Sequence, residues 1–475
     1  MIGEKKYLLV EQHLRNGMNN GVYLPDDKLP SIRQLSIDLH VSKNTVIRAY
    51  QELEALGLIY AVAKSGYRVK WPVHQGQYQH VQEPKEVDLL TLSRSLLTYP
   101  NYKEILPTGS AHPNTDFPAI KSLYAEIARQ SRTQSNVSSH YQLPPGDGKL
   151  IRQLLKISLD LGVPAQSESI SVTHGAQQAI SLALRALTQP GDIVAVESPC
   201  YFGSLLLMEA LGLKVLEIPS CVRTGIDPLA FEEASRLWDI KALLITPNFT
   251  NPTGARLPLN KRKTLLQVSG DIPIIEDDVF GSLCTEKAIP SLFSLDDKGR
   301  VIYVNSLSKT LDSRLRIGWL ISGRYHTQID KYLLCENMGG SNLMQSAVAD
   351  FLTTGKYKIH LNKIRRVYQQ NQRRFNLMLS QELNLHDNLV GRYHITQPEG
   401  SFLVWLTLPK GFDSYKVCQL CREQGISILP GSMFGTAHQF DHCLRFSTAN
   451  FSEQVNWSKG LNGLVNIISN QLENQ

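Results

Sequence analysis

The chain has 475 residues, of which 42% are hydrophobic and 19% charged, so it fits a globular protein of two or three domains and excludes a disordered or fibrous one. No apolar run approaches the ~18 residues that span a bilayer, and the N-terminus lacks the apolar stretch of a secretory signal, so we expect neither. The net charge of +6 is too small to establish a polyanionic partner by itself, and seven scattered cysteines indicate reduced thiols and a cytoplasmic setting.

The first predicted element is a helix, because apolar residues from Tyr7 to Leu14 recur at helical spacing and the pattern ends near Gly17. A second helix should begin at Ser31, which has the S-x-x-Q spacing of a capping box with Gln34. Both helices are short and amphipathic, so they predict a small helical domain at the N-terminus.

A third helix should follow after a tight turn at His40 and Val41. Ser42 can cap this helix, which should run to about Leu56, and Gly57 can adopt the left-handed conformation that ends it. Two short helices joined by such a turn form a helix-turn-helix. The polar first turn of the third helix is what a reader of the DNA major groove presents.

Two short strands complete this region. Ile59 and Val62 predict one strand, Tyr67 and Val69 predict the other, and Lys64-Ser65-Gly66 makes the turn of a wing that carries a cation. Residues 1–70 contain ten basic and seven acidic side chains. This small excess of positive charge gives weak support for contact with DNA phosphates. A helical hairpin with a solvated basic face would explain any single feature, but the complete order favours DNA binding.

The stretch "LPSIRQLSIDLHVSKNTVIRAYQELEALGLI", with the "SGY" that follows it, resembles the winged-helix domain of GntR-type bacterial repressors. The resemblance implies that this domain binds double-stranded DNA. We place Arg33 and Arg48 on phosphates and Lys43 to Thr45 near bases. The implied DNA contacts are Arg33, Ser42, Lys43, Asn44, Thr45, Arg48 and, at the wing tip, Gly66.

Residues 71–88 break the pattern with frequent Gln, His, Pro and Gly, and they predict a linker between a domain at 1–70 and another at 89–475. In the second domain, strand-like apolar runs alternate with helical stretches. The runs lie at 170–173, 193–196, 242–246, 272–275 and 301–304. This alternation predicts an α/β fold with a mostly parallel, doubly wound sheet, which binds ligands at the carboxyl ends of its strands.

Polar residues gather where these runs end. Residues 173–177 join a strand to a helix, whose N–H groups can point at an anion. Residues 251–254 follow the run at 242–246, and residues 276–278 follow the run at 272–275. Ser306-Leu307-Ser308-Lys309 follows the run at 301–304, and Arg316 lies seven residues after Lys309. A lysine beside two hydroxyls and an arginine suits a Schiff base whose partner also carries a phosphate.

The order GAQ, NPTG, EDD, SxSK-x6-R and a late arginine is similar to that of class I aminotransferases, over roughly residues 105 to 470. This resemblance implies the type I fold of pyridoxal-phosphate-dependent transferases, with a smaller C-terminal α/β subdomain and pyridoxal 5′-phosphate as cofactor. Lys309 would be the catalytic lysine that forms the aldimine, and Arg445 would bind the substrate's α-carboxylate. The other implied cofactor-binding residues are Ala176, Gln177, Ser306, Ser308 and Arg316 at the phosphate, Tyr201 on the ring, Asp277 at the ring nitrogen and Asn251 at the 3′ oxygen.

Taken singly, each of these residues has an ordinary explanation as a turn, a helix cap or a surface ion pair, and only the ordered set favours a cofactor site. One position departs from the family. Phe280 stands where aminotransferases usually have a tyrosine whose hydroxyl reaches the 3′ oxygen. We therefore expect the cofactor to bind, but its titration and efficient transamination to be disturbed.

A GntR-type domain fused to an aminotransferase-like domain is similar to the MocR subgroup of regulators along nearly the whole chain. The resemblance implies a homodimer on paired half-sites, with a head-to-tail arrangement as one option, that responds to pyridoxal phosphate, an amine or an amino acid. An active aminotransferase with an accessory DNA-binding domain is the alternative, and an enzyme whose N-terminal region serves assembly is a third reading.

Cys418 and Cys421 form a lone CxxC, which we interpret as two core cysteines and not as a metal site.

Overall fold

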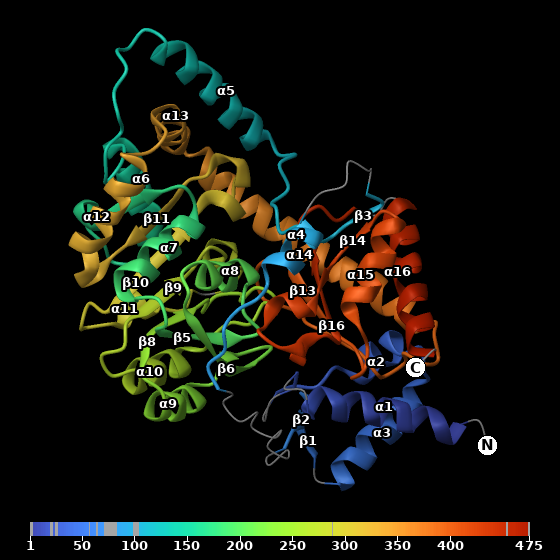
Figure 1. The fold of residues 1–475 in the computed structure, drawn as a ribbon. Coiled ribbons are helices and arrows are strands. Elements are labelled where there is room, and N and C mark those ends of the chain that lie inside the picture. The colour runs from blue at the N-terminus through green and yellow to red at the C-terminus, as the bar shows by residue number, and fades with distance from the viewer. Residues whose placement is uncertain are drawn as a thin grey trace.

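The computed structural model describes residues 3–19, 22–23, 27–56, 58–62, 65–70, 83–97, 104–286, 288–452 and 455–473. The chain forms an N-terminal head, a large α/β body and a C-terminal subdomain (Figure 1). The expected helix stop at Gly57, the wing residue Lys64 and residues 71–82 of the expected linker lie outside the described residues. Within the described part, no helix is both long and apolar enough to cross a membrane.

The head has the predicted order of elements: α1 (Gly3–Asn19), α2 (Ile32–Asp38), α3 (Lys43–Ala55) and the antiparallel pair β1 (Ile59–Val62) and β2 (Gly66–Val69). Ser42 caps α3 by accepting the N–H of Thr45 at 3.2 Å. Ser31 likewise accepts the N–H of Gln34, but the Gln34 side chain donates forward to Asp38 at 2.7 Å. The expected capping box is therefore only half formed, because the amide bonds a carboxylate one turn further along.

A small apolar core holds the head together. Leu14 of α1, Leu35 of α2 and Val46 of α3 are buried in it beside Val69 of the wing. The rings of Tyr50 and Tyr67 stack at 4.7 Å, which joins the third helix to the second strand. The helix-turn-helix and the wing therefore form one packed unit.

The body contains an eight-stranded sheet, whose order is β4 (Ile170–Thr173), β11 (Gly318–Ile321), β10 (Val301–Ser306), β9 (Ile274–Asp277), β8 (Ile240–Ile245), β5 (Ile193–Ser198), β6 (Lys214–Cys221) and β7 (Gly225–Ile226). Strands β10, β9, β8, β5 and β6 pair in parallel, while β11 is antiparallel to both of its neighbours. This confirms the mostly parallel sheet. Every residue of β10 is buried, as expected for a strand covered on both faces.

Helices cover both faces of this sheet (Figure 1). One apolar core includes α7 (Ala176–Leu187), α8 (Phe202–Ala210) and α12 (His326–Asn337). The core on the other face includes α9 (Pro228–Leu237), α10 (Leu259–Val268) and α11 (Leu292–Leu295). A further layer is formed by α5 (Pro118–Gln134), α6 (Gly148–Asp160) and α13 (Asn342–Thr353). The sheet is therefore doubly wound.

The long helix α14 (Lys356–Leu383) leads into the C-terminal subdomain. Its sheet has the order β12 (His394–Ile395), β13 (Leu403–Thr407), β16 (Cys443–Ser447) and β15 (Leu429–Pro430), and it packs with α15 (Ser414–Glu423) and α16 (Val455–Glu473). β3 (Leu106–Pro107) pairs with β14 (Ile426–Ser427). Cys418 and Cys421 lie on the buried face of α15, in the core of the subdomain. Burial raises the pKa of Cys418 to about 11.

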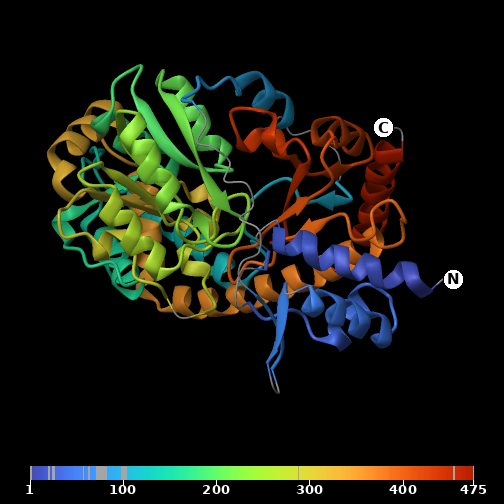
Figure 2. The same ribbon diagram turned by 90° about the horizontal axis from the view of Figure 1, so that it is seen from below.

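The head rests against the subdomain (Figure 2). The Asn16 side chain donates to the Gly391 carbonyl at 3.2 Å, and the Asn384 side chain donates to the Asp38 carbonyl at 2.7 Å. The linker was predicted to extend to residue 88, but the chain already packs on the body at Lys85. The Lys85 N–H donates to the Val215 carbonyl at 2.9 Å, and α4 (Leu90–Leu97) follows.

Candidate functional site

A cavity lies at the carboxyl ends of the parallel strands and, together with the solvent space at its mouth, encloses about 600 Å³. All nine residues that the sequence assigned to a cofactor line it: Ala176, Gln177, Tyr201, Asn251, Asp277, Ser306, Ser308, Lys309 and Arg316. They come from separate segments that meet because parallel strands end at the same edge of the sheet. The cavity wall also includes Ile180, Thr246, Val279 and Phe280.

One end of the cavity is suited to a phosphate. The N-terminus of α7 opens there, and its cap residue Gly175 supplies no side chain to its N–H groups. The hydroxyls of Ser306 and Ser308 lie beside it, 2.8 Å from each other. Arg316 adds a guanidinium group, so helix terminus, hydroxyls and positive charge converge as phosphate recognition requires.

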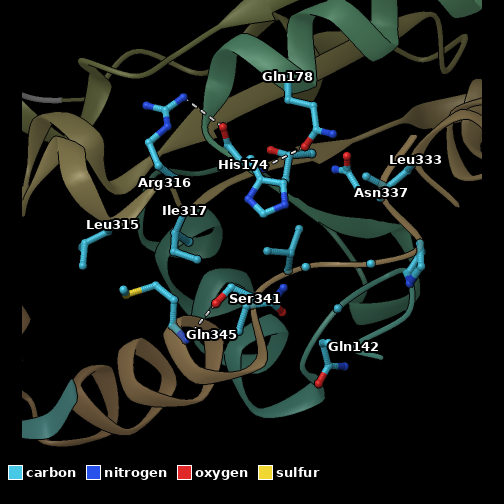
Figure 3. A pocket seen from close by; sticks show the side chains of 17 residues that line it. Gln142, His174, Gln178, Leu315, Arg316, Ile317, Leu333, Asn337, Ser341 and Gln345 are labelled. Atoms are coloured by element: carbon cyan, nitrogen blue, oxygen red, sulfur yellow. Dashed lines mark hydrogen bonds between the residues drawn. The ribbon is translucent and has the colours of Figure 1, made fainter. Parts of the chain in front are cut away.

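Arg316 is held in an unusual conformation. Its φ of 51° is left-handed, which is uncommon for a residue other than glycine and is often found at functional sites. Its Nη2 donates to the His174 carbonyl at 2.9 Å. Figure 3 shows this bond on the side of a second cavity of about 390 Å³, so Arg316 lines both cavities. At Gly175 an added Cβ would lie 2.6 Å from the same Nη2, and only glycine leaves room for the guanidinium.

Lys309 presents its amine to the cavity. Its Nζ donates to the Ala111 carbonyl at 3.0 Å and lies 5.5 Å from the centre of the Phe280 ring. Desolvation first, and then the nearby Arg445, lower the pKa of Lys309 to about 8, while Asp277 opposes the shift. A lysine with a lowered pKa has a substantial neutral fraction near neutral pH, which is the nucleophilic form.

Two buried polar groups on the cavity wall stand out, one by its raised pKa and the other by an atom without a partner. Burial raises the pKa of Asp277 to about 7, although the Val279 N–H donates to its carboxyl at 3.2 Å. The Oδ1 atom of Asn251 is buried and has no hydrogen-bond partner among the described residues. Burying a polar atom without a partner is costly, so this wall fits a ligand with polar ring substituents.

Arg445 lies beyond this cavity, on β16. It pairs with Trp405 and Leu429 in the sheet and is 1% exposed. Its Nη2 donates to the carbonyl of Gly109, while the carbonyl of Ala111 accepts from Lys309. Residues 108–112, which we term the strap, therefore run between the two cations and contact both through backbone oxygens.

The strap is fixed at both ends. The Thr108 carbonyl accepts the N–H of Ser447 at 2.8 Å, and His112 Nδ1 lies 2.9 Å from the Ser313 hydroxyl. No sequence pattern indicates the strap, because backbone carbonyls carry no residue signature. No pattern indicates Thr246 either, since a single threonine after a strand is unremarkable; its N–H donates to Glu197 at 2.8 Å.

The expected DNA contacts lie together on the head. Arg33, Ser42, Lys43, Asn44, Arg48 and Gly66 are exposed and Thr45 is half-buried. The Arg48 guanidinium lies 4.1 Å from the centre of the Tyr7 ring, so it also braces α1 against α3. The hydroxyls of Ser42 and Thr45 bond each other at 2.8 Å, which leaves Lys43 and Asn44 as the uncommitted polar side chains of this turn.

Comparison with known proteins assigns both the head and the rest of the chain to protein families. Residues 110–456 match the family "Aminotransferase class I and II", and residues 6–69 match "Bacterial regulatory proteins, gntR family". The HTH-type transcriptional regulator YjiR of Escherichia coli K12 is 35% identical over 92% of this chain and 93% of its own length. The HTH-type transcriptional regulator YdcR of the same organism is 32% identical over 94% of this chain and 95% of its own.

Solved structures agree with the family assignment of the body. The α-aminoadipate aminotransferase LysN of Thermus thermophilus, complexed with N-(5′-phosphopyridoxyl)-L-leucine, is 26% identical with a TM-score of 0.72, covering 80% of this chain and 95% of that one. An archaeal alanine:glyoxylate aminotransferase shares the fold with a TM-score of 0.70 at 24% identity, covering 78% and 92%. The cofactor of this domain is pyridoxal phosphate. With a GntR helix-turn-helix domain joined to an aminotransferase class I and II domain, the chain belongs to the MocR subgroup of GntR-family transcriptional regulators.

Proposed function

We propose that the protein is a transcriptional regulator whose DNA binding responds to an amine or amino acid recognised at its pyridoxal phosphate site. The observation that carries this proposal is a cavity lined by all nine residues assigned to the cofactor, in a chain whose other end is a helix-turn-helix. When bound, pyridoxal phosphate supplies an aldehyde that condenses with primary amines. Lys309 would hold it covalently, because this amine lies in the cavity with a lowered pKa.

The other cavity residues divide by chemistry. Ala176, Gln177, Ser306, Ser308 and Arg316 would bind the phosphate, Tyr201 would pack on the ring, Asp277 would bind the ring nitrogen and Asn251 the 3′ oxygen. The buried, unpartnered amide oxygen of Asn251 and the raised pKa of Asp277 support a polar ring at this wall. Asp277 would hold a proton between its carboxyl and the ring nitrogen, which a buried carboxyl can do.

Arg445 would bind the carboxylate of an effector amino acid. In the present arrangement the carbonyl of Gly109 accepts from Nη2 of Arg445, so a carboxylate that binds this nitrogen would displace that part of the strap. The effector's amine competes in the same way with the contact between Lys309 and the Ala111 carbonyl. A ligand that binds only the displaced form shifts the population toward it, and this shift is the signal that the head would receive.

On DNA, we propose contacts from Arg33, Ser42, Lys43, Asn44, Thr45, Arg48 and Gly66 in a homodimer that binds paired half-sites. Lys43 and Asn44 are the best-placed candidates to reach bases, since the neighbouring hydroxyls cap α3. Truncation of Arg33 should weaken binding to all sequences and flatten its salt dependence, whereas Lys43→Ala should relax specificity.

The decisive experiment combines cofactor and DNA readouts on the full chain. Borohydride reduction followed by peptide mapping should place one adduct, on Lys309, and Lys309→Ala should lose it. Genomic fragments selected by the wild-type protein should then show a changed affinity when amino acids are added. An adduct at another lysine, or DNA affinity that no amine alters, would contradict the proposal.

An active aminotransferase with an accessory DNA-binding domain is the second candidate. The lowered pKa of Lys309 favours it, because a lysine that titrates near pH 8 can carry protons during turnover. Phe280 weighs against it, since its ring offers no hydroxyl to the cavity. Sustained turnover of amino donors with 2-oxoglutarate separates the two. If the head served assembly alone, Arg33→Ala and Lys43→Ala would leave DNA retardation unchanged.

A further inference from the structure

Helix α14 carries an unbalanced positive charge. Between Lys356 and Arg374 it contains seven lysines and arginines and no acidic residue. Tyr357, Ile364 and Tyr368 bury the opposite face against the body. The outward face presents the exposed side chains of Lys363, Arg366 and Arg373, which we term the α14 stripe and which spans ~15 Å along the helix.

The fold does not neutralise this charge. Among the described residues, Lys363, Arg366 and Arg373 form no ion pair, and the Lys363 amine lies 5.6 Å from the centre of the Phe117 ring. The first turn of α14 has no acidic residue, although a helix N-terminus disfavours cations such as Lys356. Like charges three residues apart also repel each other. An anionic partner from outside the chain would offset these unfavourable electrostatic interactions.

The helix that carries the stripe meets the helix-turn-helix at its C-terminal end. The C-cap of α14, Asn384, donates to the carbonyl of Asp38, which is the last residue of α2. In Figure 2 the orange helix α14 runs along the margin of the body beyond which the blue wing projects. A duplex that extends from the head along this margin of the body would reach the outward face of α14.

We propose that the α14 stripe binds the phosphate backbone of duplex DNA flanking the segment that the head reads. This inference rests on the proposed function, since the head must first hold the duplex. It extends the DNA-binding surface from the head into the aminotransferase-like domain. Contacts of this kind position the protein on the duplex and carry no base specificity.

A second copy of this chain is the other occupant to consider. Ile359 is 73% exposed and Leu377 is 45% exposed, and these two apolar side chains bracket the stripe. A self-contact through this face would, however, bring the cations of one copy against those of the other. Complementary charge therefore favours a polyanion, and subunit number is the measurement that distinguishes the two.

The test compares the full-length protein, loaded with cofactor, with the triple variant Lys363→Gln, Arg366→Gln, Arg373→Gln. Glutamine preserves helix propensity at these exposed positions. Binding to a mixed-sequence duplex of about 60 base pairs is measured by fluorescence anisotropy between about 50 and 200 mM salt. The salt slope of the triple variant should be shallower by about 2 to 3, at ~0.9 per lost phosphate contact, with affinity at 0.1 M salt at least about tenfold weaker.

A matched control removes the same charge elsewhere: Lys214→Gln, Lys416→Gln and Lys459→Gln, which are exposed on β6, α15 and α16. It should keep most of the wild-type slope. Single variants Arg366→Gln and Arg373→Gln, each expected to lose about 0.9 of slope, cover the case in which the triple variant unfolds.

Three outcomes overturn the inference: a triple variant with the wild-type slope, a control that loses as much, or a stripe variant with a changed subunit number. Failure of the proposed function looks different. The wild-type protein would then show no DNA binding at low salt, or DNA binding that Arg33→Ala and Lys43→Ala leave intact.

Discussion

Replacing Gly175 with alanine tests whether Arg316 must lie where the structure places it. Gly175 has φ 83° and ψ 171°, a region almost exclusive to glycine, so the variant is strained by ~1–3 kcal/mol. The new Cβ would also lie 2.6 Å from Nη2 and 2.9 Å from Cζ of Arg316, which forces the guanidinium aside. Losing one charge-assisted hydrogen bond to a phosphate costs ~1.5–3 kcal/mol, so cofactor affinity should fall by roughly 10- to 150-fold.

The assay is a titration of the apoprotein with pyridoxal phosphate, followed by absorbance, beside a thermal melt. Gly162→Ala is the matched control, because Gly162 has φ 75° but an added Cβ would meet nothing within 4 Å. It should lose ~1–2 kcal/mol of stability through the left-handed backbone and retain its cofactor affinity. Wild-type affinity in Gly175→Ala, or an equal loss in Gly162→Ala, would refute the role given to Arg316.

Three further predictions concern single groups. The rate at which pyridoxal phosphate joins Lys309 should rise with pH and level off above about 8, because the lowered pKa makes the amine neutral there; stopped-flow absorbance that is flat from pH 6 to 9 would contradict this. Phe280→Tyr should move the pKa of the bound cofactor's absorbance band and raise turnover with 2-oxoglutarate, since the new hydroxyl would enter the cavity; an unchanged spectral titration would count against that placement. Ser42→Ala should destabilise the head by ~1 kcal/mol through loss of the α3 cap, and Ser65→Ala, off the helix, is the control in a denaturant melt.

The elements of the fold were predictable because each carries a local signal. Polar caps such as Ser31 and Ser42 mark helix starts, and apolar runs such as residues 301–304 mark buried strands. The polar strand ends were predictable in this way, whereas the individual cofactor roles, such as that of Tyr201, were implied by the resemblance to class I aminotransferases. The cavity residues are side chains at strand ends, and the topology of a parallel sheet brings those ends to one edge.

The remainder depends on a choice between nearby partners or on contacts between segments distant in sequence. Gln34 bonds Asp38 and not the helix start, a choice that local spacing does not determine. Arg48 stacks on Tyr7, which only the packing of α1 on α3 brings near. The docking of Asn384 on α2 joins residues 346 positions apart, and no periodic pattern encodes it. The sequence does not predict which partner each of these side chains contacts, because several partners of similar chemistry are available to it.

The strap has a pharmacological consequence. Backbone oxygens of Gly109 and Ala111 each accept a hydrogen bond from Arg445 or Lys309, so under the proposed function an effector that uses these donors binds more weakly by the free energy of displacing the strap. An amine that lacks a carboxylate can exchange with the lysine contact yet leaves the Gly109 oxygen on the arginine. Such compounds should act as antagonists, and efficacy should follow the carboxylate more closely than affinity does.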